Sequence, residues 1–228
     1  MNKYNLVARV YPAILCSLPI LLLNYFLLRY YTATISDSLA QVKWPGDVSI
    51  TVVAMFMLAQ AGRFIGKHLY EQTYFADELR MPTTDLLMHG DSSLSPEYKE
   101  QIRVKIHTEA GLTLHSQEKE RLDHMAARRV IVDGVRHVRS KVKNGRLLLQ
   151  HNIEYGFVRN MIGGSVIAAF ISIGDLLVFG YFFPNQTAFV LSLVLATVYL
   201  ALMCLGRPLM FRYGKTYAKV LFQEYLAA

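Results

Sequence analysis

Apolar residues gather into four long stretches along this chain, and polar residues fill the segments between them. An α-helix needs about 20 predominantly apolar residues to cross the hydrocarbon core of a membrane. Because all four stretches approach or exceed that length, the pattern predicts four membrane-spanning helices. Their limits are residues 10–28, 48–66, 161–183 and 187–205.

The third stretch differs from the others because a polar segment leads into it without a break. Residues 147–160 contain no proline, so we expect one helix to run from this segment into the apolar stretch. Asp175 is the one acidic residue of that stretch and lies near its middle. The sequence therefore predicts a carboxylate at mid-membrane depth.

A first soluble helix is predicted from its end signals. Ser95 can cap a helix that begins at Pro96, and glutamates in the first turns suit the positive end of the helix dipole. Gly111 is typical of the residue that ends a helix. We therefore expect a helix over residues 96–110.

A second soluble helix is expected over residues 117–143, and it carries a narrow apolar stripe. The stripe follows a 4-3-4 spacing and consists of Ile131, Val135, Val138 and Val142. Such a heptad-like seam packs either inside its own domain or against a second copy of the chain. Two heptads are short for a coiled coil, which favours packing inside the domain.

The segment after residue 205 has the pattern of a basic amphipathic helix. Basic side chains share one side of it, and tyrosines with Val220 and Leu221 share the other. Such a helix can lie on the inner leaflet of the membrane or pack against the cytoplasmic domain.

Together these elements predict an all-α membrane protein in which two transmembrane helical hairpins flank a mainly helical cytoplasmic domain. The chain is 53% hydrophobic and 18% charged, which is too apolar for an ordinary soluble domain and too charged for a bundle of membrane helices alone. The predicted parts are residues 1–66 (first hairpin), 67–160 (cytoplasmic basic domain), 161–206 (second hairpin) and 207–228 (cytoplasmic amphipathic tail helix).

The distribution of Lys and Arg predicts the orientation of the chain. Of 24 such residues, 16 lie between Arg63 and Arg159 and four lie in the tail, whereas none lies between the third and fourth stretches. By the positive-inside rule, both termini and the central domain are cytoplasmic. The net charge of +7 then faces the cell interior and suits anionic lipid, nucleotide or nucleic acid.

Known catalytic and metal-binding motifs are absent from the sequence. The seven histidines show no metal-ligand spacing, and no phosphate-binding or nucleophile motif occurs. Glu118, Glu120 and Asp123 are interpreted as surface acids, and Cys16 and Cys204 as small buried side chains. We therefore expect no enzyme, no cofactor and no metal site.

Basic residues of the helix over 117–143 and just beyond it form the first candidate site. They are Arg128, Arg129, Arg136, Arg139, Lys141, Lys143 and Arg146. Guanidinium groups match the oxygens of phosphate, so this face can bind a phosphate-bearing ligand. The alternative is a solvated face that complements acidic lipid or the acids of its own domain.

Asp175 is the second candidate site. An ionised side chain at the bilayer centre costs about 2.5–3.5 kcal/mol on insertion scales and usually faces a partner or a watery cavity. If subunits assemble around an axis, their copies of Asp175 would line a pore that attracts cations. The alternative is a protonated carboxyl that is hydrogen-bonded to a neighbouring helix.

A resemblance to a known group of proteins rests on two motifs. Pro82-Thr83-Thr84 is the first, and the more specific one is Asn152-Ile153-Glu154-Tyr155-Gly156-Phe157-Val158-Arg159-Asn160. These motifs resemble those of a group of small bacterial four-pass membrane proteins with paired helices around a cytoplasmic insert. The layout is also similar to membrane effectors of anti-phage defence systems, which respond to nucleotide or oligonucleotide signals. The resemblance implies the bacterial inner membrane.

The second motif is also a plausible junction between domain and membrane. Asn152, Arg159 and Asn160 can bond to backbone groups or lipid phosphate, Tyr155 can lie at the interface, and Gly156 lets the chain bend.

The leading hypothesis from the sequence is a homo-oligomeric inner-membrane effector. Its basic domain would sense an anionic signal, and its helices would form or gate an ion path. Two alternatives stay open: a non-conducting anchor or scaffold that recruits a cytosolic partner protein, and a small transporter component.

Overall fold

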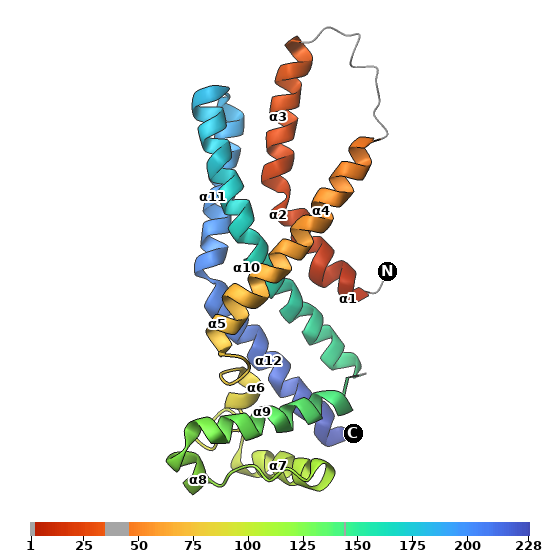
Figure 1. Cartoon of the computed structure of the whole chain (residues 1–228), viewed down its shortest axis with the longest axis vertical. Coiled ribbons are helices and arrows are strands. Elements are labelled where there is room, and N and C mark those ends of the chain that lie inside the picture. Colours follow the sequence, from red (N-terminus) through yellow and green to blue (C-terminus); the bar gives the residue numbers. More distant parts are fainter. Residues whose placement is uncertain (1–2, 35–45, 144) are drawn as a thin grey trace. The chain divides into compact units, whose positions relative to one another are not determined.

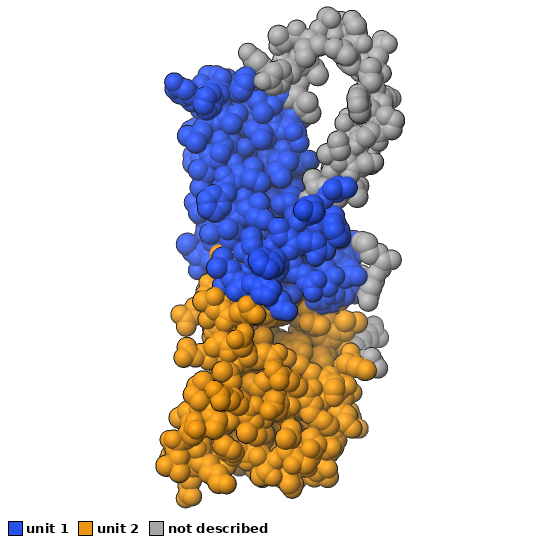
Figure 2. Space-filling view, viewed as in Figure 1, with its two compact units in different colours: residues 1–69, 157–206 blue, residues 70–156, 207–228 orange. Residues whose placement is uncertain are grey.

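A computed structural model describes residues 3–34, 46–143 and 145–228 of the chain, without the side chains at 28–34, 46–52, 54, 55 and 146. The described residues are mostly helical and contain no strand, which confirms the all-α prediction. The chain divides into two compact units, which are coloured separately in Figure 2. Unit 1 comprises Met1–Leu69 and Phe157–Gly206, and unit 2 comprises Tyr70–Gly156 and Arg207–Ala228.

Figure 1 labels most of the helical elements in chain order. Those of unit 1 are α1 (Lys3–Asn5), η1 (Leu6–Val10), α2 (Tyr11–Cys16), α3 (Leu18–Thr34), α4 (Gly46–Ile65), η3 (Val178–Phe182) and α11 (Gln186–Cys204). Those of unit 2 are α5 (Gln72–Phe75), α6 (Pro82–Asp85), α7 (Pro96–Ala110), α8 (Gln117–Leu122), α9 (His124–Lys141) and α12 (Gly206–Ala227). Two elements extend over several residues of both units, η2 (Gly66–Glu71) and α10 (Arg146–Leu177), and α12 has only its first residue, Gly206, in unit 1.

Among the described residues, three helices are long and apolar enough to cross a membrane: Lys3–Leu27, Leu147–Phe182 and Gln186–Cys204. They correspond to the first, third and fourth predicted stretches, and they support the assignment as a membrane protein. The third helix begins in the polar segment, as expected, and Gly156 lies inside it rather than at its end. The second predicted stretch, residues 48–66, coincides with α4, but several of its side chains lie outside the described residues.

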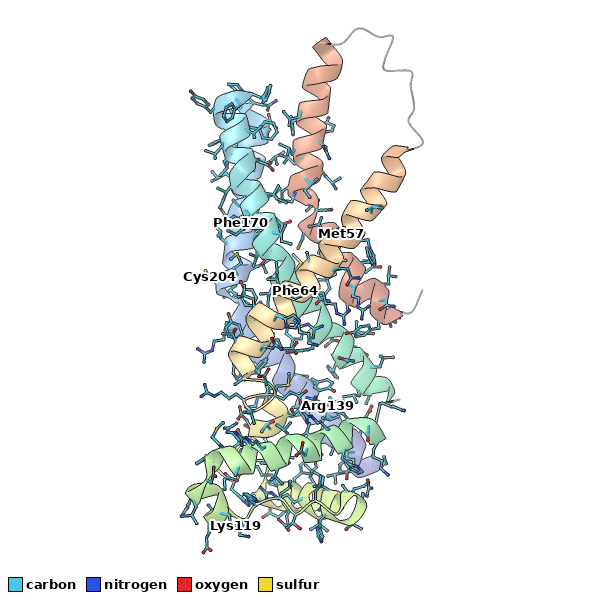
Figure 3. The ribbon with its side chains drawn as sticks, in the orientation of Figure 1. Met57, Phe64, Lys119, Arg139, Phe170 and Cys204 are labelled. Carbon is cyan, nitrogen blue, oxygen red and sulfur yellow. The ribbon has the colours of Figure 1, made fainter. Side chains whose placement is uncertain are left out.

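Unit 1 buries small residues and exposes large apolar ones. Ala168 and Ser192 are 0% exposed, whereas Phe170 is 74% exposed and Tyr181 is 79% exposed. Phe170 is labelled in Figure 3. Ile162, Phe179 and Tyr199 are large exceptions among its buried residues. Small residues let helix backbones approach closely, which is how helices pack where the surroundings are as apolar as the side chains themselves.

The closest helix approach of unit 1 involves glycines of α4, η2 and α10. A Cβ atom on Gly163 would lie 2.1 Å from the carbonyl oxygen of Gly62 and 2.4 Å from the amide nitrogen of Gly66. A Cβ on Gly66 would lie 2.5 Å from the carbonyl oxygen of Arg159. Because these neighbours are backbone atoms, they cannot move aside, and glycine is required at the crossing. Gly62 and Gly66 have the Gly-x-x-x-Gly spacing of membrane helix contacts.

Unit 2 has a conventional core of large apolar side chains. Helices α7 and α9 and the tail helix α12 contribute Ile106, Val138 and Phe222, all 0% exposed. The predicted seam lies wholly inside this core, because Ile131, Val135, Val138 and Val142 are all buried. The tail helix buries Ala218, Leu221, Phe222 and Tyr225 in the same core. For the seam of α9 and for the tail helix, the structure therefore supports packing inside the chain.

The helix over residues 96–110 has the predicted limits. The Ser95 hydroxyl accepts a hydrogen bond from the Tyr98 amide at 3.2 Å, and Gly111 has the left-handed φ of 67°.

The prediction of one helix over residues 117–143 is wrong at Asp123. This residue is extended, with φ −141° and ψ 90°, and its carboxylate caps α9 by accepting the amides of Met125 and Ala126 at 3.0 and 2.9 Å. An aspartate that caps a new helix stops the previous one. Helix α9 also ends at Lys141, two residues earlier than expected.

Candidate functional site

The predicted basic face is only partly free for a ligand. Arg129 and Lys143 are exposed and contact no acidic side chain in the described part of the chain. Arg128, by contrast, lies 2.6 Å from an oxygen of Asp85 and also donates to the carbonyl oxygen of Leu79 at 2.6 Å. Lys141 lies 3.9 Å from Glu109. The side chain of Arg146 is outside the described residues.

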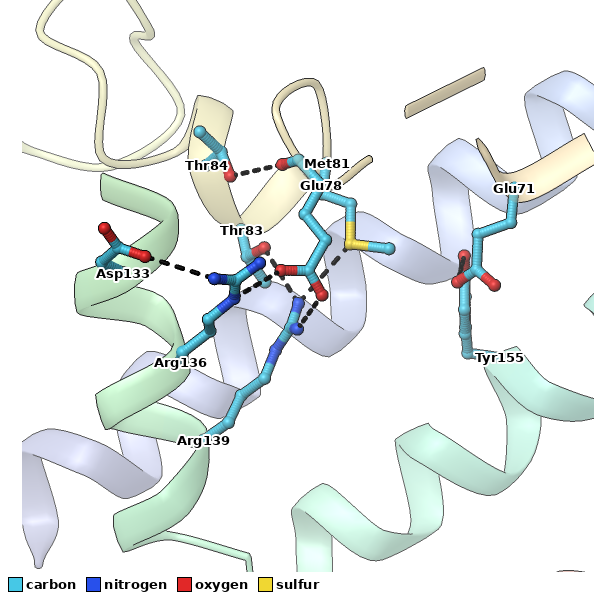
Figure 4. A network of polar contacts seen from close by, with 9 residues as sticks. All are labelled: Glu71, Glu78, Met81, Thr83, Thr84, Asp133, Arg136, Arg139 and Tyr155. Carbon is cyan, nitrogen blue, oxygen red and sulfur yellow. Dashed lines mark hydrogen bonds and ion pairs between the residues drawn. The ribbon is translucent and has the colours of Figure 1, made fainter. Parts of the chain in front are cut away.

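Arg136 and Arg139 converge on one carboxylate, that of Glu78 (Figure 4). The Nη1 atom of Arg139 donates to Oε1 of Glu78 at 2.8 Å, and Nε of Arg136 lies 3.4 Å from Oε2. Arg136 also contacts Asp133 at 3.3 Å. Burial raises the pKa of Tyr217, and its hydrogen bond with Arg139 partly opposes that rise. We call the three residues Glu78, Arg136 and Arg139 the Glu78 clamp.

Glu78 belongs to a turn with an unusual backbone. Ala76, Asp77 and Glu78 have φ of 44°, 52° and 76°, and no other non-glycine residue in the described ranges has a positive φ. A left-handed conformation costs about 1–2 kcal/mol for a residue with a Cβ atom. The turn is held at both ends, because Phe75 before it and Pro82 after it are buried. Sequence reasoning missed it because the segment contains no glycine.

A second charged cluster is buried in unit 2. Lys99, Arg103 and Glu120 are 4%, 8% and 3% exposed. The interpretation of Glu120 as a surface acid is therefore wrong: it lies 3.9 Å from Arg103 and accepts the amide of His89 at 3.0 Å. The spacing of Lys99, Ile102 and Arg103 could have revealed the cluster, because it places two cations on an apolar helix face.

The cations of this cluster bind backbone carbonyls. The Lys99 ammonium donates to Met88 at 2.6 Å and to Asp91, and Arg103 donates to Leu87 at 2.9 Å. Burial lowers the pKa of Lys99, and the charge of Asp91 opposes part of that effect. Because these donors satisfy carbonyls that have no helical partner, the cluster holds the segment before α7 in place. The contacts of this cluster therefore indicate a structural role.

The junction residues on α10 have separate roles. Asn160 is buried in unit 1 and donates to the carbonyl oxygen of Ala8 at 2.6 Å, as expected for a residue that satisfies a backbone group. Arg159 donates to the side-chain oxygen of Asn160 at 3.4 Å. Tyr155 donates to Glu71 at 2.9 Å within unit 2, and Asn152 is exposed. The structure thus does not gather these four residues into one site.

Asp175 is buried inside unit 1. It is 1% exposed, and its Oδ2 atom has no hydrogen-bond partner among the described residues. Ser172, one turn earlier on α10, is also buried and donates to the carbonyl oxygen of Ala168.

The register of α10 against α11 sets the neighbours of Asp175. Ala168 belongs to the same cluster as Tyr199, and a Cβ on Gly180 would contact Phe189. This antiparallel register places Ser192 at the level of Asp175, and Ser192 is buried as well. A buried carboxyl in a membrane helix is able to hold a proton or a monovalent cation.

The structure also shows how the metal-ligand residue types and the two cysteines are placed. No group of three His, Cys, Asp or Glu side chains there could hold a metal ion. Cys16 is buried in unit 1, as predicted, whereas Cys204 is exposed, contrary to the prediction, because it lies on the outward side of α11. The label in Figure 3 marks its position.

Comparison with known proteins adds no assignment: no family model, no curated protein and no solved structure matches this chain.

Proposed function

We propose that this chain is an oligomeric membrane effector that couples an anionic signal in unit 2 to an ion path in unit 1. The observation that carries the proposal is α10: one helix begins at Arg146 in unit 2 and carries the buried carboxylate of Asp175 in unit 1. A change in unit 2 that shifts or rotates this helix acts directly on the environment of Asp175.

The buried carboxylate supports the ion-path half of the proposal. An acidic residue in a membrane helix is costly, and Oδ2 of Asp175 has no hydrogen-bond partner among the described residues to offset that cost. A purely structural acid would gain by replacement with an apolar residue. We therefore assign Asp175 to the binding of a proton or a monovalent cation on the path.

The exposed cations of α9 support the signal half. Arg136 and Arg129 both have exposed side chains. Guanidinium groups suit phosphate oxygens, so the proposed signal is a nucleotide or a short oligonucleotide. Anionic lipid is the proposed partner of the exposed basic side chains nearest the membrane.

The proposed setting follows from charge and resemblance. The excess of Lys and Arg in the central segment and tail supports an orientation in the bacterial inner membrane with both termini inside. The second predicted hairpin agrees with this orientation, because no Lys or Arg lies between its two helices. The likeness in layout to anti-phage membrane effectors supports a role in antiviral defence.

Potassium efflux from liposomes tests the proposal. Purified wild-type chain is reconstituted into vesicles of phosphatidylethanolamine and phosphatidylglycerol, and efflux is recorded with and without adenosine triphosphate or an oligoadenylate. We expect Asp175→Asn to change the efflux at least ten-fold while the protein still assembles. Gly174→Ala is the matched control, because a Cβ there meets no atom within 4 Å. Equal efflux in wild type and Asp175→Asn would remove the ion-path assignment.

A second candidate function is a non-conducting membrane anchor that recruits a cytosolic protein. The observation that favours it is the burial of Asp175 within a single chain, since a pore-lining acid would be expected on an open face. An anchor would show no efflux, would be indifferent to Asp175→Asn, and would retain a partner protein on purification.

A further inference from the structure

We infer that Glu78 is an internal occupant of an anion site made by Arg136 and Arg139, and that a phosphate-bearing ligand replaces it and releases the left-handed turn over residues 76–78. This inference rests on the proposed function, because it identifies how the anionic signal is received. It adds that the site is closed in the absence of a ligand by the chain's own carboxylate.

The geometry of the Glu78 clamp matches what a phosphate requires. Each oxygen of the carboxylate faces one guanidinium group, at 2.8 Å for Arg139 and 3.4 Å for Arg136. A phosphate group presents oxygens at similar spacing, carries more charge and accepts more hydrogen bonds, so it is the stronger partner for two arginines.

The clamp is open to exchange. The side chain of Arg136 is 63% exposed and that of Glu78 is 31% exposed, so an incoming anion can reach both without disturbing the core. Water reaches and screens ion pairs at such exposure, so an incoming anion can exchange with the carboxylate. Arg128 is a poorer receptor, because it is also bound to the backbone carbonyl of Leu79.

The left-handed turn provides the response. Three consecutive residues with a Cβ atom hold a conformation that such residues rarely adopt, and strained backbone of this kind persists only where its surroundings enforce it. Three contacts act on Glu78: the arginine pair on its side chain, and the Thr84 hydroxyl and the Met81 amide, which donate to its carbonyl oxygen at 2.8 and 3.2 Å. Loss of the first contact lets the turn relax.

The position of the turn in the chain gives the release a consequence. The segments α4, η2 and α5 follow one another without a gap from Gly46 to Phe75, and the turn begins at the next residue. This helical run therefore ends in the turn that Glu78 holds. Release of Glu78 frees the end of a run that begins in unit 1.

The test measures pyrophosphate and adenosine triphosphate binding by titration calorimetry on the full chain in detergent. We expect Glu78→Gln to bind both probes at least ten-fold more tightly than wild type, because the competing charge is gone. Glu118→Gln makes the same charge change at an exposed position and is expected to bind like wild type. Glu78→Asp keeps the charge on a shorter side chain and is expected to give an intermediate affinity.

Hydrogen exchange of the amides at residues 76–81 is the second measurement. We expect faster exchange in Glu78→Gln and in wild type with saturating pyrophosphate, and no change in Glu118→Gln. If wild type and Glu78→Gln bind equally well, or if exchange in the turn does not respond, the internal-occupant inference is wrong while the anion site stands. If no variant binds either probe, the anion site itself is refuted, and the proposed function loses its signal half.

Discussion

The two units of this chain are built in opposite ways. Unit 1 places small residues such as Ala168 and Ser192 inside and large apolar residues such as Phe170 outside, whereas unit 2 buries Ile106 and Phe222 and exposes charged residues. In water, burial of large apolar side chains is the main stabilising term. In a hydrocarbon surrounding that term is absent, and close backbone packing replaces it. The comparison teaches that each unit is built for a different solvent.

The buried charges differ in the same sense. Unit 2 buries Lys99, Arg103 and Glu120, and each of them bonds to a backbone group, although Nε of Arg103 has no hydrogen-bond partner among the described residues. Unit 1 buries Asp175, which has no ion-pair partner and whose Oδ2 atom has no hydrogen-bond partner among the described residues. Buried charges that pair with an opposite charge hold a structure together, whereas a buried acid without such a partner is the better candidate for binding. This contrast separates the structural cluster from the proposed functional carboxylate.

The largest effect is expected at the glycine crossing of unit 1. Gly163→Leu should prevent the contact of α10 with α4, because the added Cβ atom would lie 2.1 and 2.4 Å from backbone atoms of Gly62 and Gly66. We expect a loss of more than about 3 kcal/mol, or no folded unit 1 at all. Thermal unfolding in detergent measures it, with Gly174→Ala as the control on the same helix. A Gly163→Leu variant as stable as the control would show that the helices do not meet there.

The next effect is expected in the core of unit 2. Phe222→Ala removes a fully buried ring from the contact of α12 with α9 and should cost about 3–5 kcal/mol. Urea unfolding followed by tyrosine fluorescence measures it. Phe170→Ala, which trims an exposed ring of unit 1, should change the stability in detergent by less than about 1 kcal/mol. A similar loss of stability in Phe222→Ala and Phe170→Ala would contradict the account that the two units are built for different solvents.

A smaller effect is expected from the buried charged cluster. Glu120→Gln removes the charge opposite Arg103 but keeps an oxygen for the His89 amide, so we expect a loss of about 1–3 kcal/mol. Glu118 lies two residues away in the same helix and is exposed, so Glu118→Gln should cost less than about 0.5 kcal/mol. If both variants unfold alike, Glu120 is not the partner of Arg103 in solution.

The smallest effect is a pH dependence in unit 2. Burial raises the pKa of Glu109, but a hydrogen bond from His137 and the charges of Lys141 and Lys105 outweigh it, so the folded-state pKa is lowered. Its contribution is present above the unfolded pKa of about 4.3 and is lost as the pH falls through the folded value. Glu109→Gln should therefore flatten the acid side of the stability curve slightly. An unchanged acid side would show that these contacts are not formed.

Much of the fold could be predicted from local patterns. The Ser95 cap, the Gly111 end and the apolar seam each depend on a short spacing, and the structure has all three. The break at Asp123 was missed because the charged run around it suits a helix on either side. The Gly-x-x-x-Gly spacing of Gly62 and Gly66 is visible in the sequence, but its partner on α10 is about 100 residues away.

The candidate site was less predictable. The sequence identifies the arginines of α9 but not Glu78, which lies some 60 residues earlier in a turn without glycine. Nothing in a spacing pattern shows that one carboxylate meets two arginines, because the contact depends on how α9 packs against the turn. The burial of Asp175 within one chain likewise depends on packing among helices that are distant in sequence.

Spin-label accessibility in liposomes tests the two-solvent account most directly. Labels are placed at Phe170→Cys in unit 1 and at Val104→Cys in unit 2, both exposed, in a Cys204→Ser background with Cys16 left buried. The account predicts high oxygen and low aqueous nickel-chelate accessibility at position 170, and the reverse at position 104. Equal nickel-chelate accessibility at the two positions would contradict it.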